Sequence, residues 1–326
     1  MPACPAVSVE SAAGCTLCPR RCGAERTLQD PGRCGAAEPP GFFRVARLMA
    51  HHWEEPWISG SRGSGAVFFS GCSLGCCFCQ NASISLRRQG TVLSQDRLIG
   101  EIGRLLRQGV HNLNLVTAGH YASQIPDLVS QLRRLPEWTS QGQPLPVVWN
   151  SSGYETEAAL LALAKTANVF LPDFKYADPN LSAAMAQADD YFAVASRAIL
   201  MMHRLQPKTV LSDSGIILRG LVVRHLVLPG HWRDSCRILD YLAENLPLDT
   251  PLSLMCQYTP PADPRQVAEF PELQRHLTTF EYRKVISHAL DLGFSRIIGQ
   301  GREAAQASYT PDFSVLRDDG GRDART

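Results

Sequence analysis

Four cysteines stand within eight positions in the segment GCSLGCCFCQN, and this cluster constrains the chain more than any other feature. Cys72, Cys76 and Cys79 form the spacing CxxxCxxC, and no obvious fourth cysteine follows nearby. A structural zinc site is closed by four ligands, whereas three thiolates on a four-iron cluster leave one iron open to a small molecule. The spacing therefore indicates an iron–sulfur site with an open coordination position. A zinc site completed by a distant cysteine, Cys236 or Cys256, is the alternative.

A second cysteine cluster, CTLCPRRCGAERTLQDPGRCG, lies near the N-terminus. Two short intervals let one turn present three thiolates, and the Asp-Pro-Gly sequence that follows lets the chain double back to deliver a fourth. Four thiolates serve structural zinc and also hold iron–sulfur clusters, so zinc and an auxiliary iron–sulfur cluster both fit. The pattern predicts a Cys-rich metal-binding module over residues 1–40, with the ligands Cys15, Cys18, Cys22 and Cys34.

Composition limits the class of protein. The chain has 326 residues, enough for one large domain and an appendage. The cysteines number 11, an odd count that favours metal ligation in a reducing compartment over a disulfide framework. The net charge of +1 gives no overall field that would attract nucleic acid or an anionic membrane. No apolar run of membrane-spanning length and no signal peptide is evident, so we expect a cytoplasmic protein.

The rest of the chain alternates short apolar runs with helical segments. Leu98, Ile102 and Leu105 belong to a stripe with helical periodicity, and Thr278 with Glu281 predicts a capping box at the start of a helix near 279–292. Strands alternating with helices form a parallel sheet with helices outside it. The predicted strands are residues 66–70, 112–117, 146–150, 168–173, 221–228, 252–256 and 294–299.

The aromatic Phe78 just before the third cysteine completes a CxxxCxΦC pattern that resembles the signature of the radical S-adenosylmethionine (radical SAM) superfamily. The resemblance implies a 4Fe-4S cluster whose open iron is chelated by SAM, and a one-electron reductant such as a flavodoxin or ferredoxin. It implies reductive cleavage of SAM to a 5′-deoxyadenosyl radical that abstracts hydrogen from a substrate. It also implies an α/β fold, a partial (β/α)6 TIM-like barrel, over residues 41–302, beside the small N-terminal four-cysteine module.

Within that superfamily the chain resembles an uncharacterised branch similar to the pyruvate formate-lyase activating enzyme. The Asp-Phe-Lys of 173–175, the Asn-Ser-Ser-Gly of 150–153 and the Leu-Pro-Gly of 228–230 after Arg224 carry this resemblance. The usual Gly-Gly-Glu after the second strand is replaced by Thr-Ala-Gly-His-Tyr at 117–121. The cofactor contacts that the resemblance implies are Phe78, Thr117, Asn150, Ser152, Asp173, Lys175 and Arg224.

Other polar residues occur where a barrel of this kind binds its substrate, at or near the carboxyl ends of strands. The candidates for substrate or catalytic contacts are His120, Gln257, Tyr258, Glu54 and Glu55. The proline-interrupted segment 260–274 is either a lid or an exposed connection. The polar, glycine-rich tail of 303–326 is expected to be disordered.

The leading hypothesis is hydrogen abstraction from a glycyl or other carbon of a protein or peptide, as the resemblance to activating enzymes implies. A non-enzymatic iron–sulfur or zinc protein, serving electron transfer or scaffolding, is one alternative. Radical SAM modification of nucleic acid is another, which the neutral net charge disfavours. No membrane partner is expected.

Overall fold

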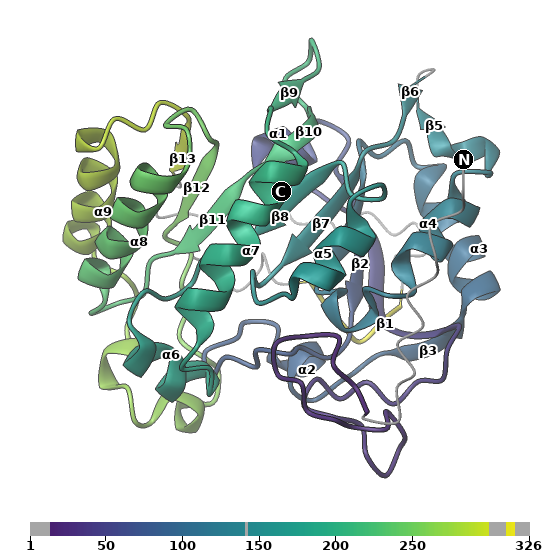
Figure 1. Cartoon of the computed structure of the whole chain (residues 1–326), viewed down its shortest axis with the longest axis horizontal. Coiled ribbons are helices and arrows are strands. Elements are labelled where there is room, and N and C mark those ends of the chain that lie inside the picture. The colour runs from purple at the N-terminus through teal and green to yellow at the C-terminus, as the bar shows by residue number, and fades with distance from the viewer. Residues whose placement is uncertain (1–13, 141–142, 300–310, 317–326) are drawn as a thin grey trace.

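The fold is built on two adjoining sheets whose strands are mostly parallel. The computed structural model describes residues 14–140, 143–299 and 311–316 (Figure 1). Within these residues the larger sheet has the strand order β3-β1-β2-β4-β7-β8-β10-β9, and the smaller has the order β11-β12-β13. The bounds are β1 Phe42–His51, β2 Ser64–Phe69, β3 Thr91–Ser94, β4 Leu113–Val116, β7 Val147–Ser151, β8 Val169–Pro172, β9 Val210–Leu211, β10 Ile217–Leu221, β11 Val223–Leu226, β12 Leu252–Met255 and β13 Ile297–Gly299.

The parallel strands run as one series across both sheets. β2, β4, β7, β8 and β10 pair in parallel, and so do β11, β12 and β13. A parallel bridge between Asp173, just after β8, and Arg224, within β11, joins the two sheets. β1 and β3 flank the series on one side as antiparallel strands. The carboxyl ends of all the parallel strands therefore face the same way.

The predicted strands are confirmed with two differences, and the first is that the run 294–299 is a strand only over Ile297–Gly299. The run 221–228 is not one strand, because the chain bends at Val222: Leu221 ends β10, which pairs with β8, and Val223 begins β11, which pairs with β12. β1 was missed by the prediction. The alternation of its side chains is broken by a register shift between Val45 and Arg47, so its period-2 pattern is weak.

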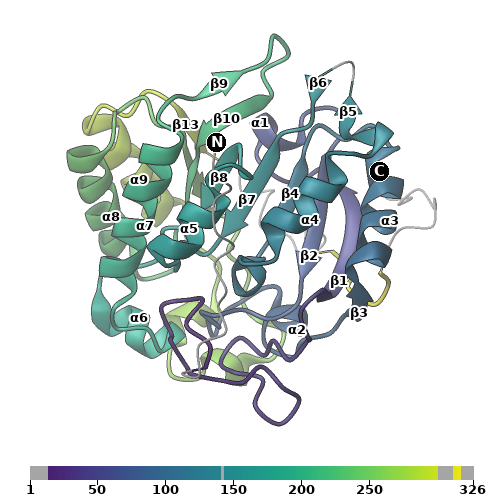
Figure 2. The ribbon, with the colours of Figure 1, turned by 45° about the vertical axis from the view of Figure 1, so that its right-hand side comes forward.

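Helices cover the outer face of the parallel strands (Figures 1 and 2). The predicted capping box is confirmed, because Thr278 accepts from the backbone N–H of Glu281 and the Glu281 carboxylate accepts from that of Thr278. The outer helices are α3 Gln95–Leu106, α4 Ile125–Leu132, α5 Glu157–Leu163, α7 Tyr191–Leu205, α8 Trp232–Asn245 and α9 Thr279–Asp291. The short helices α2 Ala82–Ser85 and α6 Pro179–Ala186 lie near the purple N-terminal segment, at the lower edge of Figure 1.

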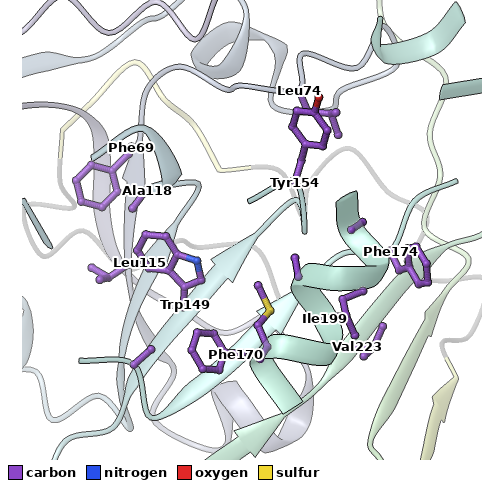
Figure 3. Packing of buried hydrophobic residues seen from close by; sticks show 14 of the residues in the cluster. Phe69, Leu74, Leu115, Ala118, Trp149, Tyr154, Phe170, Phe174, Ile199 and Val223 are labelled. Atoms are coloured by element: carbon purple, nitrogen blue, oxygen red, sulfur yellow. The ribbon is translucent and has the colours of Figure 1, made fainter. Parts of the chain in front are cut away.

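Successive residues of the strands face opposite sides, which separates a core from an inner face. On β7, Val147 and Trp149 pack in the main core beneath the outer helices, where Figure 3 shows Trp149 among neighbouring apolar side chains. Val148 faces the other side and packs in a second cluster with Ile58 of the short helix α1, Pro56–Ser59. Asn150 follows Val148 with the same period, so its side chain shares the inner face.

Part of the predicted disordered tail is packed against the sheet. The backbone N–H of Leu48 in β1 donates to the carbonyl of Leu316 at 2.7 Å. The ring of Phe313 meets that of Phe68 edge-on, with 5.4 Å between centroids. Residues 311–316, which were expected to be disordered, thus pack a partly buried aromatic ring against the sheet. Residues 303–310 and 317–326 of the predicted tail lie outside the described residues.

The segment 260–274 is a packed connection. It forms two short 3-10 helices, η3 Pro264–Val267 and η4 Pro271–Gln274, and buries Val267 and Leu273. The hydroxyl of Tyr258 donates to the carbonyl of Leu273 at 2.6 Å, which fastens the segment to the end of β12.

Among the described residues, no helix has both the length and the apolar character needed to cross a membrane.

Glu155 makes the stability of this fold sensitive to pH. Both carboxylate oxygens accept from the indole N–H of Trp149, at 2.7 and 2.9 Å, and burial raises the pKa of Glu155 from 4.5 to about 7. Above pH 4.5 the folded state therefore keeps a proton that the unfolded state releases. The stabilisation that the protonated Glu155 gives the fold is complete below pH 4.5 and is lost as the pH rises to 7. Relative to Glu155→Gln, the wild type should lose about 3 kcal/mol of unfolding free energy over that interval. Urea unfolding across the pH range measures it, and parallel curves for the two proteins would contradict it.

Candidate functional site

A cavity of about 250 Å³ opens at the carboxyl ends of the parallel strands. Most of the residues singled out from the sequence line it, although they come from widely separated parts of the chain. Polar residues placed this way, beyond the ends of several strands, are typical of binding sites in α/β barrels. The predicted residues that line the cavity are Glu54, Cys72, Cys76, Phe78, Cys79, Thr117, Asn150, Ser152, Asp173, Lys175, Arg224 and Gln257.

The cysteine loop between β2 and α2 forms one wall of the cavity. Gly71 opens the loop with φ +97°, and a Cβ there would meet the carbonyl oxygen of Cys34 at 2.4 Å, so only glycine fits. The backbone N–H of Cys79 donates to the carbonyl of Cys76 at 3.2 Å, which folds the loop back on itself. Cys72, Cys76 and Cys79 thereby all reach the same cavity.

The thiols of this loop suit a metal cluster by their chemistry. Burial raises the pKa of Cys76 to about 12 and also raises that of Cys79, although the charge of Lys175 acts in the opposite direction on both. Buried thiols of this kind become thiolates when a metal replaces the proton. Across residues 14–140, 143–299 and 311–316, no three His, Cys, Asp or Glu side chains are arranged to hold a single metal ion. Thiolates are the usual ligands of iron–sulfur clusters, and the donor set fits one.

Each of the three thiols has a hydrogen-bond donor beside it. The hydroxyl of Tyr176 lies 3.3 Å from the sulfur of Cys76, and the hydroxyl of Ser85 lies 3.2 Å from that of Cys79. The backbone N–H of Leu74 donates to the sulfur of Cys72 at 3.4 Å. Neither hydroxyl was predicted from the sequence, because Ser85 lies in a short helix without a motif and Tyr176 comes from a distant strand end.

An ion-pair network forms the opposite wall. The guanidinium of Arg224 donates from Nε to Asp173 at 2.8 Å, from Nη1 to Glu54 at 3.0 Å and from Nη2 to Asn150 at 2.6 Å. The ammonium of Lys175 donates to the other carboxylate oxygen of Asp173 at 2.6 Å. Two cations and two carboxylates thus balance one another at the cavity.

Asp173 is the centre of this network. Burial alone would raise its pKa, but Arg224 and Lys175 outweigh that effect and lower it, so Asp173 is ionised. Burial opposes the charge of Lys175 as well, and Asp173 reverses this and raises the pKa of the ammonium. Lys175 is therefore a charged group held beside the thiols of Cys76 and Cys79.

Three of the predicted substrate contacts do not line this cavity. His120 lines a separate space of about 20 Å³, and burial lowers its pKa to about 4. Tyr258 is fully buried with its hydroxyl bound to a backbone carbonyl. Glu55 is buried as well, and burial raises its pKa. His120 and Tyr258 follow strands and Glu55 precedes a proline, as the sequence indicated. Their side chains nevertheless point into the surrounding structure and not into the cavity.

His51 and Trp53 line the cavity but were not predicted. The ring of His51 packs edge-on against Phe68, and burial lowers its pKa to about 4, so it is neutral. Trp53 has 58% of its surface exposed and therefore lies where the cavity opens. His51 is the last residue of β1, and Trp53 lies between β1 and α1, beside Glu54, which the sequence singled out.

The four N-terminal cysteines lie close to this loop, outside the cavity lining. Cys34 is buried, Cys15 and Cys18 are half-buried, and Cys22 is exposed. Burial raises the pKa of Cys18 to about 11, and the neighbouring thiols contribute to that shift.

Comparison with known proteins identifies the domain. Residues 66–227 match the family model of the radical SAM superfamily. Over these residues the chain is similar to a radical SAM domain. Proteins of that superfamily bind SAM at a 4Fe-4S cluster, and the thiol loop, Thr117, Asn150, Asp173, Lys175 and Arg224 lie within the matched residues, whereas Glu54 and Gln257 lie outside them.

Two individual proteins are also similar to this chain. An uncharacterized protein of Methanocaldococcus jannaschii is 28% identical over 283 residues, which cover 84% of this chain and 74% of that protein. A crystal structure of a radical SAM methyltransferase from Sphaerobacter thermophilus has a TM-score of 0.49 at 11% identity. The match covers 71% of this chain and 63% of that one, less than two thirds of its length.

Thr117 has a strained backbone in the radical SAM domain. It lies just after β4 with φ +59°, a conformation that is costly for a β-branched residue, and its N–H donates to the carbonyl of Asn150 at 2.9 Å. Its side chain lines the cavity, in the region where the sequence lacks the Gly-Gly-Glu element. Strain of this kind accumulates at binding sites, where the surrounding structure holds it.

The hydroxyls beside the thiols should control the reduction potential of the cluster. A hydrogen bond to a thiolate favours the more negative, reduced state. Ser85→Ala and Tyr176→Phe should each lower the midpoint potential by tens of millivolts, where about 59 mV is a tenfold change for one electron. A redox titration followed by electron paramagnetic resonance measures the change. Ser83→Ala, in the same short helix, is the control, and equal potentials in all four proteins would exclude this role.

Replacing Thr117 by Gly should separate stability from SAM binding. Glycine adopts the left-handed conformation freely, so the variant should unfold at the same free energy as the wild type or up to about 1 kcal/mol higher. Loss of the side chain from the cavity wall should weaken SAM binding several-fold, on the order of 1 kcal/mol for one hydrogen bond. Urea unfolding and isothermal titration with SAM test the two parts. SAM affinity equal to that of the wild type would exclude Thr117 as a contact.

Proposed function

We propose that the protein is a radical SAM enzyme that abstracts a hydrogen atom from a carbon of a protein or peptide substrate. The observation that carries the proposal is that Cys72, Cys76 and Cys79 open onto the same cavity as the charged network of Asp173, Lys175 and Arg224. When bound, a three-thiolate 4Fe-4S cluster with SAM supplies reductive cleavage of SAM to methionine and a 5′-deoxyadenosyl radical. The protein's own residues bind and orient SAM and exclude water.

Lys175 is the cation best placed for the carboxylate of SAM. It lies close enough to Cys76 and Cys79 for its charge to lower the pKa of both thiols. Among the described residues the ammonium donates to Asp173, at 2.6 Å, and an ammonium has three donors, so a second carboxylate can bind without breaking that pair. Arg224 is less available, because two carboxylates and an amide already accept from its guanidinium.

Asn150, Ser152 and Thr117 would bind the polar parts of SAM between the thiols and the charged network. Ser152 and Thr117 offer hydroxyls that both donate and accept, which suits ribose hydroxyls and an ammonium group. Asn150 is held in place from two sides, because its amide donates to Glu54 at 3.1 Å and its oxygen accepts from Arg224. Phe78 is buried against Tyr176 and Tyr258 and keeps water from the thiols.

The activating-enzyme-like role rests on the motif resemblance at 173–175, 150–153 and 228–230. Under this proposal the substrate is a protein or peptide, the electron donor is a flavodoxin or ferredoxin, and the reaction takes place in the cytoplasm. An opening at which Trp53 is exposed supports a macromolecular substrate, because aromatic side chains are enriched where proteins bind one another. We also propose that Cys15, Cys18, Cys22 and Cys34 hold zinc or an auxiliary iron–sulfur cluster in a module of residues 1–40.

The test is the electron paramagnetic resonance spectrum of the anaerobically reconstituted, reduced protein, recorded without and with SAM. We expect SAM to change the cluster signal in the wild type, because one iron is open. Cys79→Ala should lose this response. A cluster signal that is indifferent to SAM would reject the enzyme and favour an electron-transfer or scaffold protein.

Lys175→Met in the same experiment tests the carboxylate site. Its cluster signal should form as in the wild type, but the SAM concentration that gives half of the change should rise by roughly tenfold or more, as expected for a charged hydrogen bond. Lys165→Met replaces an exposed lysine away from the cavity and is the matched control. Equal SAM dependence for the two variants would exclude Lys175 as the contact.

A further inference from the structure

Arg20 joins three parts of the chain that are far apart in the sequence. Its guanidinium donates from Nε to the carbonyl of Ser73 at 2.8 Å and from Nη2 to that of Leu74 at 3.1 Å. It also donates to the carbonyl of Ala186 at 2.6 Å and to that of Gln187. One side chain thus binds four backbone carbonyls, a use of the guanidinium fork that lysine cannot reproduce.

Two of these carbonyls belong to the thiol loop itself, and the other two belong to the end of α6. Ser73 and Leu74 lie between the thiols of Cys72 and Cys76. Ala186 ends α6, and Gln187 is its C-cap, in the left-handed conformation. The last carbonyls of a helix lack partners within the helix and favour a nearby cation. Arg20 therefore fixes the loop to a rigid element of the barrel.

Other contacts of the N-terminal segment reinforce this junction. The carbonyl of Cys34 lies against Gly71, so the segment contacts the chain on both sides of Cys72. The hydroxyl of Thr156 donates to the carbonyl of Leu17 at 3.1 Å, and the guanidinium of Arg20 lies 5.3 Å from the centroid of the Tyr154 ring. These residues anchor the segment at the start of α5.

The N-terminal segment has little structure of its own with which to position Arg20. Residues 14–39 contain no helix or strand. The turns around Arg20 are held by a few backbone hydrogen bonds, among them Cys15 N–H to the carbonyl of Ala24 at 3.0 Å and Arg21 N–H to that of Cys18 at 3.0 Å. A segment with so small a core usually needs a metal to fix its shape.

We propose that the N-terminal four-cysteine segment is a clamp for the thiol loop. An auxiliary iron–sulfur cluster held by Cys15, Cys18, Cys22 and Cys34 fixes the segment, and Arg20 transmits this order to residues 71–79. The clamp rests on the proposed function, because the loop that it holds is the one proposed to bind the catalytic cluster. Arg20 is a positioning residue here: it acts on the backbone between two thiols and contacts neither SAM nor substrate.

Arg20→Gln and Arg21→Gln form the matched pair for the test. Both remove a guanidinium from the same turn, and Arg21 is exposed. After anaerobic reconstitution, a ferrous chelator is added and the SAM-responsive resonance signal is followed with time. Arg20→Gln should lose this signal roughly tenfold faster than the wild type, since several charge-assisted hydrogen bonds are lost. Arg21→Gln should match the wild type, and Arg20→Lys should fall between them.

Cys22→Ser tests whether the metal acts through Arg20. It should lose the N-terminal metal, measured by elemental analysis, which also distinguishes zinc from iron, and it should shorten the lifetime of the cluster as Arg20→Gln does. The double variant should decay no faster than the faster single variant. Thermal unfolding by circular dichroism checks that each variant is folded.

Two results would overturn the clamp: loss of the N-terminal metal without any change in cluster lifetime, or an Arg20→Gln variant that behaves as Arg21→Gln does. Failure of the proposed function gives a different result. If the wild-type cluster signal does not change with SAM, the proposed function is rejected. The lifetime of the cluster in the same variants, followed by its own resonance signal, would still test the clamp. A wild type that holds no cluster at residues 72–79 would reject both.

Discussion

The contact between Asp173 and Arg224 holds the site together. Their backbones form the bridge that joins the two sheets, and the N–H of Phe174 donates to the carbonyl of Arg224 at 2.7 Å. Their side chains meet in an ion pair at 2.8 Å across the same point. The strand series therefore continues from β8 to β11 at two residues that both line the cavity. A shift of either backbone would displace the guanidinium, and with it Glu54 and Asn150.

This network is poorly explained as a device for stability. Burying charges costs several kcal/mol per ion, by an order-of-magnitude estimate, and their attraction offsets this only when every group is satisfied. Apolar side chains in the same place would give equal stability without the need to satisfy every charge. The amino ends of the same strands are packed with apolar side chains, where Ile58 packs with Val148 and Val169. The charged residues of the network lie just after β8, within β11 and just before α1. Their position is better explained by a ligand that carries both charges, as SAM does.

The sequence predicted which residues line this cavity where a residue's position follows from its place in a strand. Asp173, Lys175 and Asn150 directly follow apolar runs, and the period of 2 fixes which face they occupy. It failed where a side chain's direction depends on packing: Tyr258 also follows a strand, yet its ring turns into the core against Phe78. Ser85 and Tyr176 could not have been found, because their function is defined by which sulfur they contact. Arg20 was hidden for a similar reason, since its four partners are backbone carbonyls and carry no sequence signal.

The electrostatics of the cavity link its two walls. Burial disfavours ionisation of Cys76 and Cys79, and Lys175 favours it. The ammonium is itself buried and stays charged because Asp173 is ionised, which in turn requires the charge of Arg224. Arg224 therefore affects the pKa of the thiols indirectly, through Asp173 and Lys175. Neutralising any member of this series would weaken the charge of the next, so the cluster ligands depend on a residue of β11 and on two residues that follow β8.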